Sequence, residues 1–305
     1  MPKQKISSGF KIVLVLAFVA IVAYLIFKPK KEELPTIGEV AIEEKVDTTT
    51  TLFKYNNILF SLPSPYQISL LMEKSGMSYN KALLNSTKKA SDYVSNFSKA
   101  VNFGVYGSDL GYINIYRQTQ DAASYFAVVK ILSQDIGLYN ALDKPTIKRI
   151  EHNIENRDSL LVIISNTYRK IDNYLKSNNR DNTGALILAG GWVESLYILT
   201  QQLKDENNNE LLLRIAEQKR PLDNLIKLLV PYSNDSKDNY WLVENLIELA
   251  YAFDEIEEKY TYIPPKTNSR KKFTLIKSKS DFIVQDNQIQ KITDKIALIR
   301  EQLIK

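Results

Sequence analysis

The sequence predicts an all-α body, either a multi-helix bundle or an array of helical hairpins, with a small β-hairpin near its C-terminus and one transmembrane helix in front. Gly and Pro number only 10 each in 305 residues, so turn signals are too few for an all-β fold. Residues 12–27 are uniformly apolar, and apolar side chains recur at helical spacing through residues 286–304. Hydrophobic residues (44%) and charged residues (25%) occur at globular frequencies, which excludes extensive disorder.

The N-terminal apolar run predicts a membrane anchor. Residues 12–27 are bounded by Lys11 and Lys28. A helix of this length spans roughly 24 Å, close to the roughly 30 Å hydrocarbon core once the flanking lysines extend toward the head groups. A cleaved signal peptide is the alternative. It is disfavoured because Ala20 and Ala23 are three apart rather than two, and the apolar run continues beyond them.

Charge divides the chain into an anchor region and a nearly neutral body. We expect residues 1–11 to be a short basic tail, residues 28–52 a tether and residues 53–305 the helical body. Residues 1–31 hold six Lys and no acidic residue, which leaves 34 of the 40 basic and all 35 acidic residues to the rest. The body therefore lacks a charge basis for nucleic-acid binding. A short N-terminal tail and a large C-terminal domain favour a single-pass signal-anchor with its N-terminus inside and its body outside the membrane; export after signal-peptide cleavage is the alternative.

Capping signals place the first helices of the body, after an extended segment at residues 53–63. Ser64 is a good N-cap, Pro65 suits the first turn, and Gly76 lies just past the end. Ser86 or Thr87 opens the next helix. The predicted helices are residues 65–76, 86–104 and 108–137, the last of them capped by Ser108.

The following helices are placed in the same way. Asp143 and Asp158 are candidate caps, and Pro145 fits only a first turn. Asp235 or Ser236 caps a helix that ends near residue 259. The predicted helices are one or two within residues 143–178, one over 182–204, and one over 207–230 interrupted by Pro221.

The last section, residues 260–305, changes character. Residues 260–265 are extended, and residues 272–277 and 281–285 predict a β-hairpin that turns at Lys279 and Ser280. A final helix follows over residues 286–304. Nearby basic residues either contact anionic head groups or protect a solvated edge strand, which is the commoner use of such residues; they are Arg270, Lys271, Lys272, Lys277 and Lys279.

One polar face is a candidate ligand or partner site. Asp109 falls in the first turn of the helix predicted over residues 108–137, where it is either a cap or, in a functional interpretation, a general base or ligand contact. Tyr112, Tyr116 and Gln120 are spaced four apart and so share a helical face. They predict a buried polar network or, alternatively, a cleft to which Trp192 contributes.

Small residues four apart predict a close helix crossing. Gly in a helix interior costs about 0.5–1 kcal/mol relative to Ala, so a packing reason is expected. We therefore expect the helices over residues 108–137 and 182–204 to cross at these small residues: Gly107, Gly111, Ala185, Ala189 and Gly191.

Catalytic and metal chemistry have little support in the composition. The chain has no Cys and one His, His152, which excludes disulfides, Cys-bound zinc, iron–sulfur clusters and thiol nucleophiles. Glu244 and Glu248 form an (i, i+4) pair that is best interpreted as solvated. A carboxylate hydrolase using Asp109 and Glu194 is the remaining enzymatic hypothesis. We expect no cofactor, no metal and no catalysis.

Three segments carry a resemblance. They are Gly-Val-Tyr-Gly-Ser-Asp-Leu-Gly-Tyr at residues 104–112, Tyr-Arg-Gln-Thr-Gln at 116–120, and Ala-Gly-Gly-Trp-Val-Glu-Ser-Leu-Tyr at 189–197. Over residues 60–205 the chain resembles an uncharacterised family of mostly helical, exported envelope proteins of Gram-negative bacteria. The resemblance implies an export-competent helical domain and no known activity. In a Gram-negative envelope, the orientation expected for the anchor places it in the inner membrane and the body in the periplasm.

The expected function is a protein-interaction or scaffolding module of the cell envelope, anchored in the lipid bilayer through residues 12–27 and bound to a protein partner. Helical surfaces rich in Tyr, of which this chain has 18, suit partner binding because the side chain is both apolar and polar. The alternative is a small-ligand binding or sensing domain whose cleft is lined by Tyr and Gln.

Overall fold

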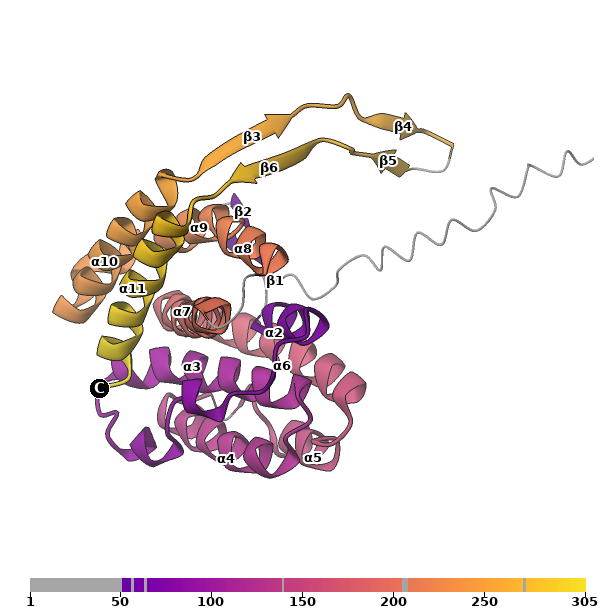
Figure 1. Ribbon diagram of the computed structural model, residues 1–305. Helices are drawn as coiled ribbons and strands as arrows, with labels where there is room; N and C mark the ends of the chain where they lie inside the picture. Colours follow the sequence, from indigo (N-terminus) through magenta and orange to yellow (C-terminus); the bar gives the residue numbers. More distant parts are fainter. Residues whose placement is uncertain (1–50, 56–57, 63–64, 139, 205–207, 271–272) are drawn as a thin grey trace, which may run out of the picture. The chain divides into compact units, whose positions relative to one another are not determined.

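The computed structural model describes residues 51–55, 58–62, 65–138, 140–204, 208–270 and 273–305. Helices hold 71% of these residues, which confirms the mainly helical prediction (Figure 1). The predicted tail and anchor, and the tether up to residue 50, lie outside the described residues. The α-helices are α2 (Pro65–Lys74), α3 (Asn96–Ile115), α4 (Thr119–Asp135), α5 (Lys144–His152), α6 (Arg157–Ser177), α7 (Asp181–Lys204), α8 (Asn209–Ala216), α9 (Lys219–Leu229), α10 (Lys237–Asp254) and α11 (Asp286–Leu303).

Short elements complete the described chain. The 3-10 helices are η1 (Lys81–Leu83), η2 (Thr87–Ser91) and η3 (Val230–Asp235), and the strands are β1 (Thr51–Tyr55), β2 (Ile58–Leu62), β3 (Glu257–Thr261), β4 (Lys266–Asn268), β5 (Phe273–Leu275) and β6 (Lys279–Ile283). β1 and β2 form an antiparallel hairpin within the segment predicted to be extended, so the chain already forms a strand in the last two residues assigned to the tether.

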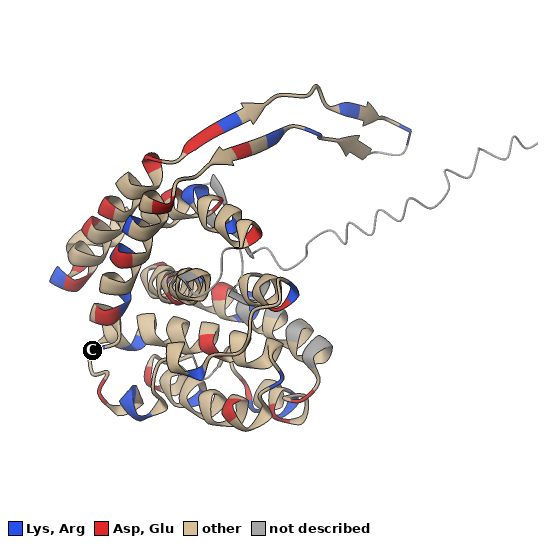
Figure 2. Ribbon diagram, in the orientation of Figure 1, with Lys and Arg blue, Asp and Glu red and all other residues tan. Residues whose placement is uncertain are grey.

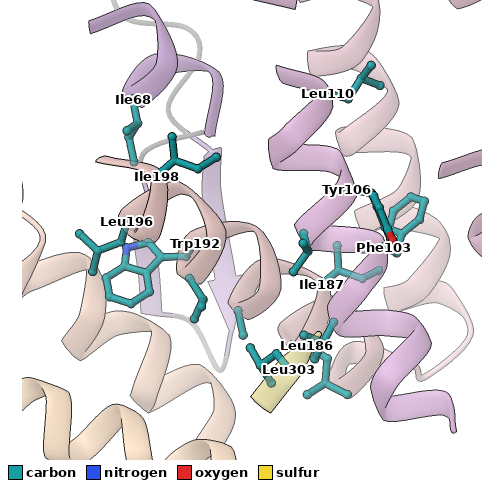
Figure 3. Packing of buried hydrophobic residues seen from close by; sticks show 14 of the residues in the cluster. Ile68, Phe103, Tyr106, Leu110, Leu186, Ile187, Trp192, Leu196, Ile198 and Leu303 are labelled. Carbon is teal, nitrogen blue, oxygen red and sulfur yellow. The ribbon is translucent and has the colours of Figure 1, made fainter. Parts of the chain in front are cut away.

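Two central helices, α3 and α7, organise the core. Of residues 100–115 in α3, all but Gly107 are buried, because apolar side chains occur all around this helix. α7 is equally apolar. Its segment Asp181–Leu203 is long and apolar enough to cross a membrane, but 78% of its most apolar 18-residue stretch is buried inside the fold, as in a core helix. Figure 3 shows Phe103 and Tyr106 of α3 and Ile187 and Leu196 of α7 among the buried side chains.

The helices α3 and α7 cross at two glycines. A Cβ atom on Gly104 would lie 2.0 Å from the carbonyl oxygen of Ile187, and one on Gly190 would lie 2.0 Å from that of Val101. Neither position tolerates a side chain, so the two backbones are in direct contact there. The sequence placed the crossing at Gly107 and Gly111 on one helix and near Ala185, Ala189 and Gly191, with Gly190 beside it, on the other. The contact on α7 does lie at Gly190, whereas that on α3 lies at Gly104, one turn before Gly107. Gly191 is adjacent to the contact, since its backbone nitrogen would be 2.8 Å from a Gly104 Cβ.

The predicted helix boundary at Gly104 and the predicted helix over residues 108–137 are wrong. α3 begins after Ser95, whose hydroxyl accepts a hydrogen bond from the Ser98 backbone N–H at 3.0 Å, and it runs through Gly104 without interruption. The break comes at Arg117, which adopts a left-handed conformation (φ 57°) between α3 and α4. Gly104 therefore serves close packing, and the chain reverses at a residue that is not glycine.

The later boundaries are confirmed in part. α10 ends at Asp254 rather than near residue 259, and the break in the helix predicted over 207–230 falls between α8 and α9, so Pro221 lies inside α9. Asp143 caps α5 by accepting from the Thr146 N–H at 2.8 Å, with Pro145 in the first turn, and Ser236 caps α10. α7 is continuous through Gly190 and its neighbour, as predicted. The cap of α6 is Asn156 rather than Asp158. α11 spans the predicted range, and the five residues of its apolar stripe are all buried: Ile289, Ile292, Ile296, Ile299 and Leu303.

The chain between α10 and α11 forms a long hairpin, residues 257–283, which we call the arm (Figure 1). Near the helices, β3 pairs with β6 so that Glu257 faces Ile283 and Thr261 faces Lys279. Farther out, β4 pairs with β5, Lys266 facing Leu275. The predicted turn at Lys279 and Ser280 is therefore wrong. Both residues lie inside β6, because the segment near residue 260 is a strand partner rather than a connection.

Candidate functional site

A buried ionic centre joins three helices. It consists of Asp109 of α3, Glu194 of α7 and Arg300 of α11, and both acidic residues are 0% exposed. The Arg300 Nε donates to Glu194 Oε2 at 2.9 Å, and Nη2 donates to Oε1 at 2.9 Å. This bidentate arrangement is among the strongest that a carboxylate can form. Nη2 also donates to the Leu83 carbonyl oxygen at 3.0 Å, and the guanidinium lies 4.4 Å from the Tyr197 ring centre.

Burial favours the protonated form of Asp109. Its Oδ2 accepts from the Asn85 backbone N–H at 3.2 Å, while Oδ1 is buried without a donor among the described residues. Burial, followed by the charge of Glu194, raises the pKa of Asp109 well above its ordinary value of 3.8, although Arg300 opposes the shift. In its protonated form the carboxyl group is a hydrogen-bond donor beside Glu194.

Polar contacts also hold the C-terminal end of α11. The Asn102 side chain of α3 donates to the Leu303 carbonyl oxygen at 2.8 Å. Lys89 donates to the Ile304 carbonyl oxygen at 3.0 Å. These groups satisfy carbonyls that the end of a helix leaves without partners. Together with Arg300, they fix α11 against the two central helices.

The predicted tyrosine face is only partly assembled. α3 ends at Ile115, so Tyr112 lies on α3, Tyr116 follows it, and Gln120 is exposed on α4. Tyr79, Tyr112 and Tyr116 form a cluster with ring centres 4.8–5.9 Å apart. The Tyr112 hydroxyl accepts from the Asn80 backbone N–H and the Gln202 amide, both at 2.9 Å. Tyr112 is therefore a buried, hydrogen-bonded core residue, and Gln120 does not join it.

The other predicted site residues also lie in the core. Trp192 is 3% exposed, and its indole N–H donates to Gln218 Oε1 at 3.3 Å. Ala185 and Ala189 are buried on α7. The prediction that Asp109 caps a helix is wrong, because α3 begins thirteen residues earlier at Asn96.

The predicted pairs of acidic residues do not form an accessible catalytic site. The two carboxyl groups of the hydrolase hypothesis, Asp109 and Glu194, do come together, but they are enclosed. Glu244 and Glu248 are exposed, and Glu248 is ion-paired with Lys295. Within the residues that the structure describes, no group of three or more His, Asp or Glu is arranged to hold a metal ion.

The arm is the most exposed element of the described chain. Five large apolar side chains on it are more than half exposed, which is unusual for so short a segment of a folded protein; they are Tyr260, Tyr262, Phe273, Ile276 and Ile283. Among the described ion pairs, none involves Lys266, Arg270 or Lys277, which lie in its outer part. Figure 2 shows acidic positions only near the helices and basic positions toward the tip.

The base of the arm, in contrast, is tied to the helices. Glu258 of β3 accepts from Arg220 of α9 at 2.5 Å, and Phe282 and Val284 pack against the apolar core. β6 continues directly into α11, the helix that carries Arg300. The buried ionic centre therefore holds the helix from which the arm extends.

Comparisons of the chain with protein-family models, with curated proteins and with solved structures give no match.

Sequence reasoning missed Arg300, and it noted the basic residues of the outer arm, among them Arg270 and Lys277, but not the exposed apolar side chains beside them. A signal for Arg300 existed: Glu194 is an acidic residue inside an apolar helix, and such a residue needs a cationic partner from elsewhere in the chain.

Proposed function

We propose that this protein is an interaction or scaffolding module of the cell envelope rather than an enzyme. The helical body is the rigid carrier, and the arm is the element that contacts a partner. In this proposal residues 12–27 anchor the chain in the inner membrane and the body lies in the periplasm. Export after cleavage of those residues would leave the role of the arm unchanged.

The exposure of the arm carries this proposal. Tyr262, Phe273 and Ile276 are 64%, 52% and 71% exposed. The exposed part of these side chains contributes nothing to the stability of the folded chain, because apolar surface stabilises a fold only when it is removed from water. Exposed aromatic residues beside unpaired basic residues are typical of surfaces that a partner covers. The enclosure of Asp109 and Glu194 supports the absence of catalysis, because no reacting atom can approach either carboxyl group.

Site-specific photocrosslinking in membranes tests the proposal. A photoreactive phenylalanine analogue replaces Tyr262 in the full chain. The matched control is Tyr251 on α10, which is exposed to nearly the same degree, 66% against 64%. We expect adducts at position 262, read by gel shift for protein and by mass spectrometry for lipid, and at least several times fewer at position 251. Equal yields at the two positions would mean that the arm is no special contact element.

A further inference from the structure

We infer that the partner of the arm is the anionic surface of a lipid bilayer. This inference rests on the proposed function, because it names the partner class of the same element. The docking region consists of residues 262–270 and 273–278, the outer part of the arm. It combines three properties that a charged membrane surface recognises: unpaired positive charge, exposed aromatic and aliphatic side chains, and attachment to a chain with its own membrane anchor.

Charge is the first property. Residues 262–270 and 273–278 contain Lys266, Arg270 and Lys277 and no acidic residue. The acidic residues of the arm lie at its base, where Glu258 is paired with Arg220 and Asp281 with Lys279. The outer part therefore presents only positive charge, on a body that is otherwise near neutral. Each Lys or Arg near an anionic leaflet strengthens binding about fivefold.

The distribution of apolar side chains favours a lipid surface over a protein groove. Tyr262 and Ile276 lie in the segments between the two strand pairs, whereas Phe273 lies in β5, opposite Asn268. Along the chain they are interspersed with Lys266, Arg270 and Lys277 and are spread over both strands of the arm. Protein interfaces concentrate their energy in one cluster of anchor residues, which fills a pocket on the partner. At the head-group level of a bilayer, by contrast, each aromatic or aliphatic side chain partitions separately.

Geometry allows the arm to reach the same bilayer that the anchor would occupy. The 23 residues 28–50, which precede β1, cannot span more than about 83 Å, which limits the distance of the body from the membrane. The arm is about 40 Å long, at about 3.3 Å per residue. A surface so close acts at high effective concentration, so weak contacts of the arm suffice for docking.

Site-specific fluorescence with the full chain tests the inference. The chain has no Cys, so Ser269→Cys carries a single environment-sensitive label between β4 and β5. The control is Ser177→Cys at the exposed end of α6. Each labelled protein is reconstituted into two kinds of vesicle. The neutral vesicles are made of phosphatidylcholine, and the anionic vesicles of equal parts of phosphatidylcholine and phosphatidylglycerol. Both contain added nitroxide-bearing lipid as the quencher.

We expect the label at residue 269 to be quenched in the anionic vesicles and little in the neutral ones, and the label at residue 177 in neither. Replacing Lys266, Arg270 and Lys277 by Gln should lower the ratio of docked to free arm on the order of 100-fold, because three charges of about fivefold each are lost. Salt at about 1 M, where screening acts over about 3 Å, should release the wild-type arm.

Two results would overturn the inference. Equal quenching of the 269 label in both vesicles would remove the role of charge, and the absence of quenching would remove the contact with lipid. If quenching is absent while position 262 still crosslinks to a protein in membranes, the arm remains a contact element and only the lipid assignment fails. If position 262 forms no arm-specific adduct either, the proposed function fails with it.

Discussion

The buried ionic centre and the arm use the same residue types in opposite environments. Arg300, whose side chain is 11% exposed, is bound by both oxygens of Glu194 and by a backbone carbonyl. Lys266, Arg270 and Lys277 extend into solvent without an ion pair among the described residues. A buried charge must be fully paired, because its desolvation costs several kcal/mol. Charge without an internal partner remains available to a partner outside the chain.

Among the substitutions that compare the buried ionic centre with the arm, Arg300→Met is expected to lower stability the most. The substitution leaves Glu194 buried without its cation, which should lower the free energy of unfolding by about 3–5 kcal/mol. Urea unfolding monitored by circular dichroism measures it. The control is Lys295→Met on the same helix, which breaks the surface pair with Glu248 and should cost at most about 1 kcal/mol. Similar costs for the two variants would contradict the role of the centre.

A second substitution tests the backbone contact that underlies the centre. Gly190→Ala places a Cβ atom 2.0 Å from the Val101 carbonyl oxygen, so α3 and α7 must move apart. We expect a loss of about 1–3 kcal/mol, again from urea unfolding. Gly184→Ala on the same helix is the control. Its Cβ meets only Leu175 Cδ1 at 3.5 Å, and stability should be unchanged or slightly higher. A Gly190→Ala protein as stable as wild type would refute the close crossing.

The protonation of Asp109 makes a prediction about pH. Burial raises the pKa of Asp109 in the folded state, whereas the unfolded chain releases the proton near the ordinary pKa of 3.8. The stabilisation due to this group is therefore complete below that pH and is lost as the pH rises toward the folded pKa. Asp109→Asn retains a donor for Glu194 but does not titrate.

The stability of Asp109→Asn relative to wild type should therefore grow with pH above about 4, by at most about 1.4 kcal/mol per pH unit. Urea midpoints of both proteins, measured in parallel from about pH 4 to about pH 8, provide the comparison. Parallel curves over this range would show that Asp109 is ionised in the folded state.

The smallest effect on stability is expected from removal of the outer arm. Residues 262–278 can be replaced by Asn-Gly, because Thr261 and Lys279 face each other in the β3–β6 register and a two-residue turn closes such a pair. The free energy of unfolding should change by less than about 0.5 kcal/mol, since this part makes few contacts with the core. A loss of several kcal/mol would mean that the arm is part of the core.

Periodic apolar residues made parts of the fold predictable. The stripe of α11 repeats every three or four residues and defined that helix correctly. The glycines of α3 misled because the same residue marks a helix end and a close crossing. Only the backbone of α7, which lies about 80 residues away along the chain, distinguishes the two uses. Local signals carry no information about such a partner.

Of the buried ionic centre, only the two acidic residues could be predicted from the sequence. Asp109 and Glu194 stand out as acidic residues within apolar segments. Arg300 does not stand out, because a basic residue near the end of an amphipathic helix is ordinary there, and it lies 106 residues from Glu194. The arm was predicted as a hairpin with the wrong turn. Its paired strands β3 and β6 are separated by many residues along the chain. The alternation of apolar and polar side chains in strands of five residues is too short to define their register.

The contacts at the C-terminal end of α11 determine when the helical body can complete its folding during synthesis. Asn102 binds the carbonyl of Leu303, which follows it by 201 residues. A nascent chain cannot form this contact, or the Arg300 pair, until the ribosome has released α11. Until then the two buried acidic residues of the central helices, Asp109 and Glu194, lack their cationic partner.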